Sequence, residues 1–153
     1  MSWRRVNKNE LDTKAWNDCV SKSKNEHIYG YTWYLDSVAP NWVAYVFGNY
    51  LQVFPLPVKQ KLGVSYACQP EFFQRTSIFY SLEIEKQEEL KKAIAKQFIK
   101  IDLTCSNDFF QPNKTLTNTI LNLNSQEFKL NNNTKRNIKK AERADLKYVG
   151  GNM

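Results

Sequence analysis

The sequence has 153 residues but only one histidine, five glycines and three cysteines, and these low counts exclude several kinds of site. Because His27 is the only histidine, Ser-His-Asp catalytic triads, catalytic Cys-His pairs and multi-histidine metal sites are mostly excluded. No Walker loop, GxGxxG loop or GxSxG motif is present. The cysteines lie far apart without a CxxC pair, so we expect buried thiols rather than disulfides or zinc. We expect no metal and no cofactor held within this chain.

Long apolar runs are also missing. The clearest apolar stretch, residues 42–47, has the length of a strand and falls well short of the ~20 residues that span a bilayer. No apolar segment follows Arg4 and Arg5, so the N-terminus does not read as a secretory signal. We expect a soluble, cytoplasmic protein without a membrane span.

The charge that is present is unevenly distributed. The formal net charge is +7, but residues 1–128 contain 15 basic and 13 acidic groups, whereas residues 129–153 contain seven basic groups against two acidic ones. Because a balance of +2 is ordinary for a folded domain, the excess positive charge belongs to one C-terminal element.

Hydrophobic periodicity predicts an α+β fold with a mixed, largely antiparallel sheet and helices on both faces. The expected strands cover about residues 3–6, 42–47, 50–54, 64–69, 101–105 and 117–123, and the expected helices about 9–24, 32–38, 83–100 and 134–144. Asn9 is the expected N-cap of the first helix, and Gly48-Asn49 favours a two-residue hairpin turn that opens a three-stranded meander. Pro55 and Pro57 predict an unpaired or bulged edge in the second strand of this meander.

The end of the sequence predicts a second domain. Residues 146–149 read as one more strand, after which only four residues remain. Because a domain seldom ends by opening a new strand, we expect a fragment of a longer protein, with one domain in residues 1–128 and a helix and first strand of a second in residues 129–153.

Few residues of the body point to chemistry. His27 lies between two predicted helices, where a solvated loop position is the expectation. The aromatic residues between Tyr29 and Tyr50 could stack on bases or sugars, but core packing with a few rings at a cleft is favoured. Gln69, Gln74 and Arg75 follow the third strand of the meander, where they line a cleft or serve only as polar loop residues.

The C-terminal basic segment predicts an amphipathic helix. At about 100° per residue, its cations cover an arc of about 140°. These cations are Lys135, Arg136, Lys139, Lys140 and Arg143. Three asparagines and Thr134 precede them as N-capping candidates, so the N-terminus of the helix could bind phosphate. The alternative interpretation is a solvated basic face.

Three segments together resemble the Fem-type aminoacyltransferases. Residues 133–146, which begin Asn-Thr-Lys-Arg-Asn-Ile-Lys-Lys-Ala, resemble the helix that joins the two GNAT-like domains of that family. Residues 31–35 resemble its early tryptophan-containing helix, and residues 66–70 resemble the strand end before its substrate loop. The expected element order is also similar to that of one GNAT-like domain, so the resemblance covers nearly the whole chain but about half of a family member.

The resemblance implies the N-terminal GNAT-like half of a bacterial acyltransferase that moves an acyl or aminoacyl group onto an amine. The donor would be acyl-CoA or aminoacyl-tRNA, bound mostly by the other half, so the chain alone would be inactive. Thr134 and Arg136, with Lys140, would bind a phosphate-linked acceptor, and the 135–143 helix could contact tRNA. No catalytic residue is assigned.

Two other hypotheses follow from the same residues. The chain could be a non-catalytic module that binds RNA or another polyanion through its basic helix. It could also be a structural domain whose contact is the narrow apolar seam of Ile138 and Ala141.

Overall fold

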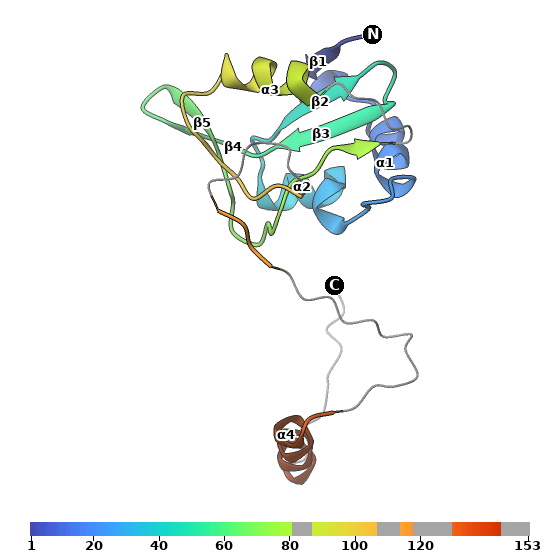
Figure 1. The fold of residues 1–153 in the computed structure, drawn as a ribbon, viewed down its shortest axis with the longest axis vertical. Helices are drawn as coiled ribbons and strands as arrows, with labels where there is room; N and C mark the ends of the chain where they lie inside the picture. The colour runs from blue at the N-terminus through green and yellow to red at the C-terminus, as the bar shows by residue number, and fades with distance from the viewer. Residues whose placement is uncertain (81–86, 107–113, 118–129, 145–153) are drawn as a thin grey trace. The chain divides into compact units, whose positions relative to one another are not determined.

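A computed structural model describes residues 1–80, 87–106, 114–117 and 130–144 of the chain (Figure 1). The chain divides into two compact units, Met1–Asn113 and Lys114–Met153. The predicted boundary between residues 128 and 129 lies outside the described residues.

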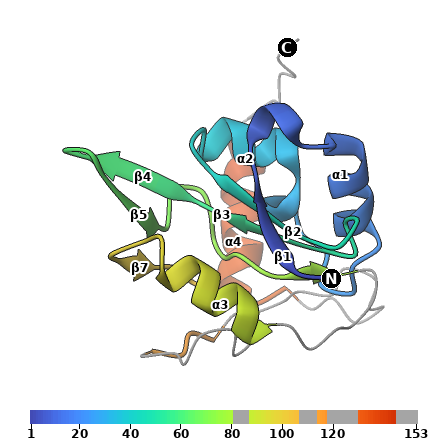
Figure 2. The same ribbon diagram turned by 90° about the horizontal axis from the view of Figure 1, so that it is seen from above.

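The first unit contains two sheets. The four-stranded sheet has the order β1-β2-β3-β6 and is antiparallel throughout, whereas the three-stranded sheet β4-β5-β7 pairs β5 with β4 antiparallel and with β7 parallel (Figure 2). The strands are β1 (Trp3–Val6), β2 (Val43–Phe47), β3 (Gln52–Leu56), β4 (Val58–Lys61), β5 (Val64–Cys68), β6 (Phe79–Tyr80) and β7 (Ile101–Asp102). The helices of this unit are η1 (Lys8–Glu10), α1 (Thr13–Ser21), η2 (Ile28–Gly30), α2 (Thr32–Val38) and α3 (Gln87–Ala95).

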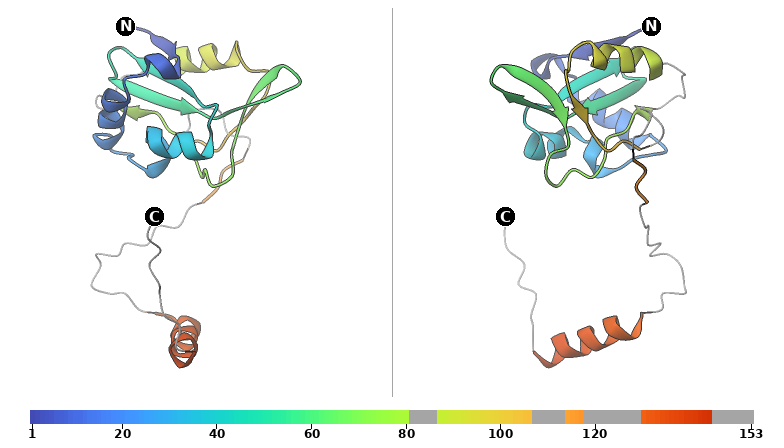
Figure 3. Two further views of the ribbon diagram at one scale, coloured as in Figure 1. Left: turned by 180° about the vertical axis from the view of Figure 1, so that it is seen from behind. Right: turned by 60° about the vertical axis from the view of Figure 1, so that its left-hand side comes forward.

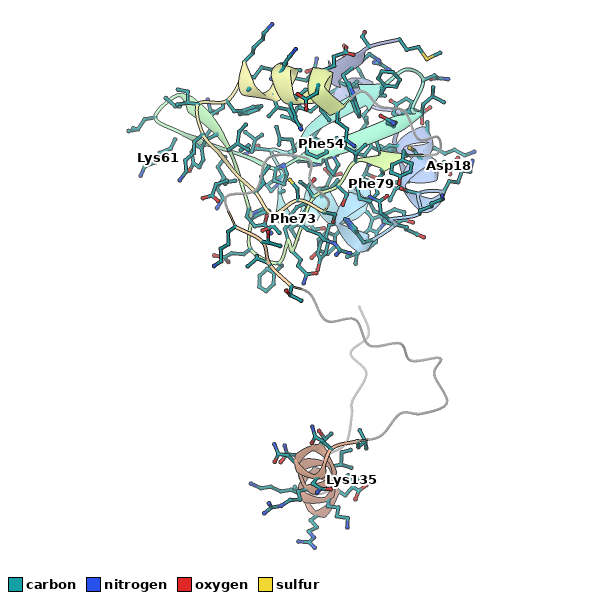
Figure 4. All side chains as sticks on the ribbon, viewed as in Figure 1. Asp18, Phe54, Lys61, Phe73, Phe79 and Lys135 are labelled. Atoms are coloured by element: carbon teal, nitrogen blue, oxygen red, sulfur yellow. The ribbon has the colours of Figure 1, made fainter. Side chains whose placement is uncertain are left out.

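Helices cover both faces of the four-stranded sheet, as Figures 1 and 3 show. Alternate residues of a strand point to opposite faces. Ala44 and Val46 of β2 pack with α1 and α2, while Tyr45 and its neighbours on the other face pack with Leu90 and Ile94 of α3. The predicted α+β class, with a mixed set of strand pairings and helices on both faces, is therefore confirmed.

The meander is divided between the two sheets. The expectation of three consecutive strands in one sheet is wrong, because the chain forms two hairpins, β2–β3 and β4–β5, on either side of Pro57. Proline has no N–H to donate to a strand partner. The predicted gap in pairing is confirmed, since β6 pairs with only Gln52 and Val53 of β3 and leaves Pro55 without a partner from that strand.

Local elements differ from the expectations in three places. The first α-helix begins after Asp12, whose side chain accepts a hydrogen bond from the Ala15 N–H at 3.0 Å, and Asn9 lies in η1 instead. The β2–β3 connection has four residues rather than two, with Gly48 and Tyr50 at φ 58° and 56°. Helix α3 ends at Ala95, five residues before the predicted end.

Other expectations are confirmed or untested. Strand β1 and helix α2 have the predicted bounds, and β7 begins at Ile101 but has two residues. The start of the long helix before residue 87 and the strands expected at 118–123 and 146–149 lie outside the described residues. None of the described helices is long and apolar enough to cross a membrane.

The second unit contains the predicted basic helix as α4 (Asn132–Arg143). Asn131 caps it, because its side-chain oxygen accepts hydrogen bonds from the N–H of Thr134 at 2.8 Å and the hydroxyl of Thr134 at 2.9 Å. None of the residues of α4 is buried.

We predict that Gly30→Ala destabilises the first unit. A Cβ atom at Gly30 would lie 2.4 Å from Cζ of Phe79, whose ring is fully buried, so the core must shift. The free energy of unfolding should fall by about 1–3 kcal/mol in urea denaturation. The control Leu62→Ala, at a side chain that is 94% exposed, should change it by less than about 0.5 kcal/mol. Equal stability of Gly30→Ala and wild type would contradict this packing.

Candidate functional site around His27 and Arg75

The loop between β5 and β6, residues 69–78, is held in place by Gln69. The Gln69 amide nitrogen donates to the carbonyls of Phe73 and Gln74, and its oxygen accepts from the N–H of Thr104 at 3.0 Å. The backbone N–H of Gln69 also donates to the carbonyl of Asp102 at 2.9 Å. Gln69 therefore positions the loop against the segment after β7.

Thr76 sets the direction of the neighbouring side chains. Its side chain is fully buried, and its hydroxyl donates to the carbonyl of Pro55 at 2.7 Å. Its backbone N–H donates to the Thr104 carbonyl at 2.8 Å. Because alternate side chains of an extended segment point in opposite directions, Arg75 and Ser77 lie on the other side, where His27 is found.

His27 forms the centre of this arrangement. Its Nε2 lies 2.9 Å from Oγ of Ser77, within hydrogen-bond distance, and its ring packs edge-on against Phe79 at 4.8 Å between centroids. Tyr29 contacts the same imidazole at 5.4 Å. The expected solvated loop position is therefore wrong: His27 is half-buried and bonded to a serine 50 residues away.

The environment keeps the imidazole neutral. Burial, together with the positive charge of Arg75, lowers the pKa of His27 from 6.5 to about 4. Nδ1 of His27 is buried without a hydrogen-bond partner among the described residues, and only an interaction with the backbone of His27 itself favours the protonated ring. At neutral pH His27 is a polar, uncharged group.

Arg75 is a partly buried cation that forms no ion pair with the described residues. Its Nε is buried and has no hydrogen-bond partner in the part of the chain that the structure describes. The ion pairs found there join Lys8 to Asp36, Lys91 to Glu88 and Lys100 to Asp102. A partly buried guanidinium favours a carboxylate or phosphate as its partner, since both match its fork of N–H donors.

The predicted binding residues fall into two groups. Gln69, Gln74 and Arg75 share one loop, in which Gln74 is exposed, and Gln69 uses its amide to hold that loop. Thr134, Arg136 and Lys140 belong to α4 in the second unit. The hydroxyl of Thr134 is used in the cap, whereas Arg136 and Lys140 are exposed.

His27 and Ser77 were missed as a pair because their partnership depends on the tertiary fold. No local motif connects residues that lie 50 positions apart. The one available signal was the loop itself, since Arg75 and Ser77 are two residues apart and share a side when the chain is extended.

Other reactive groups are arranged differently. Cys19, Cys68 and Cys105 are free thiols, and burial raises the pKa of Cys105 to about 12, which disfavours its thiolate. Among the described residues, no three His, Cys, Asp or Glu side chains lie close enough together to hold a metal ion.

Comparisons with models of protein families, with curated proteins and with solved structures gave no match to this chain.

We predict that the imidazole titrates with a pKa of about 4, as followed by the proton NMR signals of the single histidine. Unfolding restores the ordinary value of 6.5, so the unfolded chain binds more protons and stability falls as the pH drops from about 6.5 toward 4.

The loss between pH 7 and 5.5 should be about 1 kcal/mol after allowance for solvent access to the ring. In urea denaturation, the free energy of unfolding of the His27→Gln variant should fall less than that of the wild type over the same pH interval. A histidine that titrates near 6.5 in the folded protein would show that the ring is solvated.

Proposed function

We propose that the chain is part of an acyltransferase that moves an acyl or aminoacyl group onto an amine that carries an anionic group. The observation that carries the proposal is the unpaired, partly buried Arg75 beside the neutral His27–Ser77 pair. The resemblance to Fem-type enzymes and the α+β fold with helices on both faces of its sheet support the same class.

Direct acyl transfer requires little covalent chemistry from the protein. The amine nitrogen attacks the ester or thioester carbonyl, the bond to the ribose oxygen or the thiol sulfur breaks, and that leaving atom keeps the electron pair and takes up the proton that the amine loses. The protein contributes by holding the acceptor in line and by keeping its nitrogen unprotonated. Arg75 would bind the carboxylate or phosphate of the acceptor, and the uncharged His27–Ser77 pair would lie beside it without protonating the amine.

The donor in this proposal is acyl-CoA or aminoacyl-tRNA. Both carry phosphates, and the resemblance implies a tRNA contact through the exposed cations of α4, such as Arg136 and Lys140. Such a protein would act in the cytoplasm, where both donors occur.

Arg75→Gln should raise the acceptor KM about tenfold or more, because a charge-assisted bond to the acceptor is lost. The assay uses the product of the natural reading frame, with acetyl-CoA and aminoacyl-tRNA as separate donors and a panel of amines as acceptors. Lysine and lysinamide form a matched pair in this panel, since they differ only in the carboxylate.

The effect of Arg75→Gln should appear with lysine-type acceptors and be absent with their amides. Arg75→Lys keeps the charge and should retain part of the affinity. The absence of transfer from either donor to any acceptor, or an equal effect on both members of a pair, would contradict the proposal.

A second candidate function, binding of RNA or another polyanion, is favoured by helix α4. All five of its cations lie on exposed residues, and the described residues provide no ion pair for any of them. Its apolar seam is small, with Ile138 only 41% exposed, so the helix has little surface to insert into a lipid layer. A polyanion would therefore be held by charge alone.

Polyanion binding should depend steeply on salt. Five phosphate contacts predict a slope of log association constant against log salt concentration of about −4, measured by fluorescence anisotropy with a labelled RNA. Lys139→Glu with Lys140→Glu should weaken binding at least about tenfold. The matched control makes the same charge change at the exposed Lys59 and Lys61 of β4 and should have a small effect. Binding that is insensitive to salt would exclude this function.

A further inference from the structure

A group of aromatic side chains lies on the surface at α2 and the 69–78 loop. It consists of Tyr31, Trp33, Tyr34 and Phe72, which we call the aromatic surface. Trp33 is 58% exposed and Phe72 is 84% exposed, whereas Tyr31 and Tyr34 are half-buried. Of the other aromatic residues in this part of the sequence, Trp42, Tyr45 and Phe47 are buried, as core packing predicts, and Tyr29 and Tyr50 are half-buried.

The rings of the aromatic surface support one another. Tyr31 and Trp33 stack with centroids 6.2 Å apart and an interplanar angle of 30°, and Trp33 meets Tyr34 edge-on at 5.8 Å. Tyr34 in turn packs against Tyr29 at 5.5 Å, and Tyr29 contacts His27. Trp33 is therefore anchored to the interior through a series of ring contacts.

Phe72 is held outward by its backbone. It adopts a φ of 61°, in the left-handed region that bulky residues rarely occupy. The hydroxyl of Tyr34 donates to its carbonyl, and Gln69 binds the carbonyl of the next residue, Phe73. A large apolar ring kept in water by an uncommon backbone conformation is typical of a ligand-contacting position.

Two carboxylates lie close to the aromatic surface in the sequence or through a hydrogen bond. Glu26 accepts a hydrogen bond from the hydroxyl of Tyr31, and Glu71, which precedes Phe72, is exposed. In the described parts of the chain, neither carboxylate forms an ion pair. Carboxylates beside exposed aromatic faces attract cations through charge and through the ring quadrupoles, and they repel phosphates.

We propose that the aromatic surface binds a basic peptide segment, with lysine or arginine side chains over Trp33 and near Glu26 and Glu71. The aromatic rings and the two carboxylates come from two parts of this chain. Such an arrangement fits a peptide that carries more than one cation better than it fits a single small ion. This proposal goes beyond acyl transfer and is independent of it, because no residue of the aromatic surface is used in that reaction.

The test measures binding of a fluorescein-labelled peptide of alternating lysine and glycine by anisotropy. Trp33→Ala should weaken binding about fivefold to tenfold, and Glu26→Gln about threefold, because the cation loses a ring and a counter-charge respectively. Leu62→Ala removes a 94% exposed apolar side chain outside the surface and should leave the affinity unchanged.

Quenching provides a second readout. The other three tryptophans, Trp3, Trp16 and Trp42, are buried, so acrylamide quenching in the folded protein reports mainly on Trp33. The lysine peptide should protect this residue, whereas a peptide with glutamate in place of lysine should not.

Three results would overturn the proposal. These are equal binding of the lysine and glutamate peptides, unchanged affinity in Trp33→Ala and Glu26→Gln, and RNA binding that Trp33→Ala weakens. RNA binding that is lost only in the Lys139→Glu, Lys140→Glu protein would place RNA on α4 and leave the peptide assignment intact.

Discussion

The burial of β2 and β3 on both faces is the constraint on which the rest of the first unit depends. All five residues of each strand are buried, so neither face of the central hairpin contacts water. Both faces must then be apolar, and each needs its own cover of helices. Helices α1 and α2 come from before the hairpin and α3 from after it. The chain between α1 and α2 therefore packs on the same side as Phe79, which brings His27 to Ser77.

Elements that depend on local patterns could be predicted, and those that depend on distant contacts could not. The strand β1 and the helix α2 were visible in periodicity alone. The predicted start of α1 at Asn9 is wrong, although asparagine is as good an N-cap as aspartate. The fold selects Asp12, whose backbone N–H donates to the hydroxyl of Tyr50 at 2.8 Å. Tyr50 also lies in the β2–β3 turn, which has four residues where two were predicted. The single hydrogen bond between Asp12 and Tyr50, which are 38 positions apart, therefore involves both the start of α1 and the longer turn.

In the candidate site, too, local patterns predicted the residue types, whereas distant contacts determine what each side chain does. The residue types of the 69–78 loop indicated a polar site. The role of each residue, however, depends on partners that are distant in the sequence. Gln69 became a support for the loop because Thr104 lies beside it, whereas the buried Nε of Arg75 has no hydrogen-bond partner in the described part of the chain. Helix α4 was predictable almost in full, because capping by Asn131 and the basic arc involve only neighbouring residues.

Net charge describes only part of this molecule. At physiological ionic strength a charge is felt over about 8 Å, so a ligand responds to the groups it touches and not to the total. The net charge of +7 describes mainly α4, where five cations are concentrated. In residues 1–128, 15 basic and 13 acidic groups nearly cancel, yet Arg75 on one side and Glu26 and Glu71 on the other remain without ion-pair partners among the described residues. Residues 71 and 75 belong to the same loop, so a nearly neutral body can present a carboxylate and a guanidinium, neither of them in an ion pair with the described residues, within a few positions. The charge balance of a sequence could not reveal which of these charges the fold leaves without an ion-pair partner.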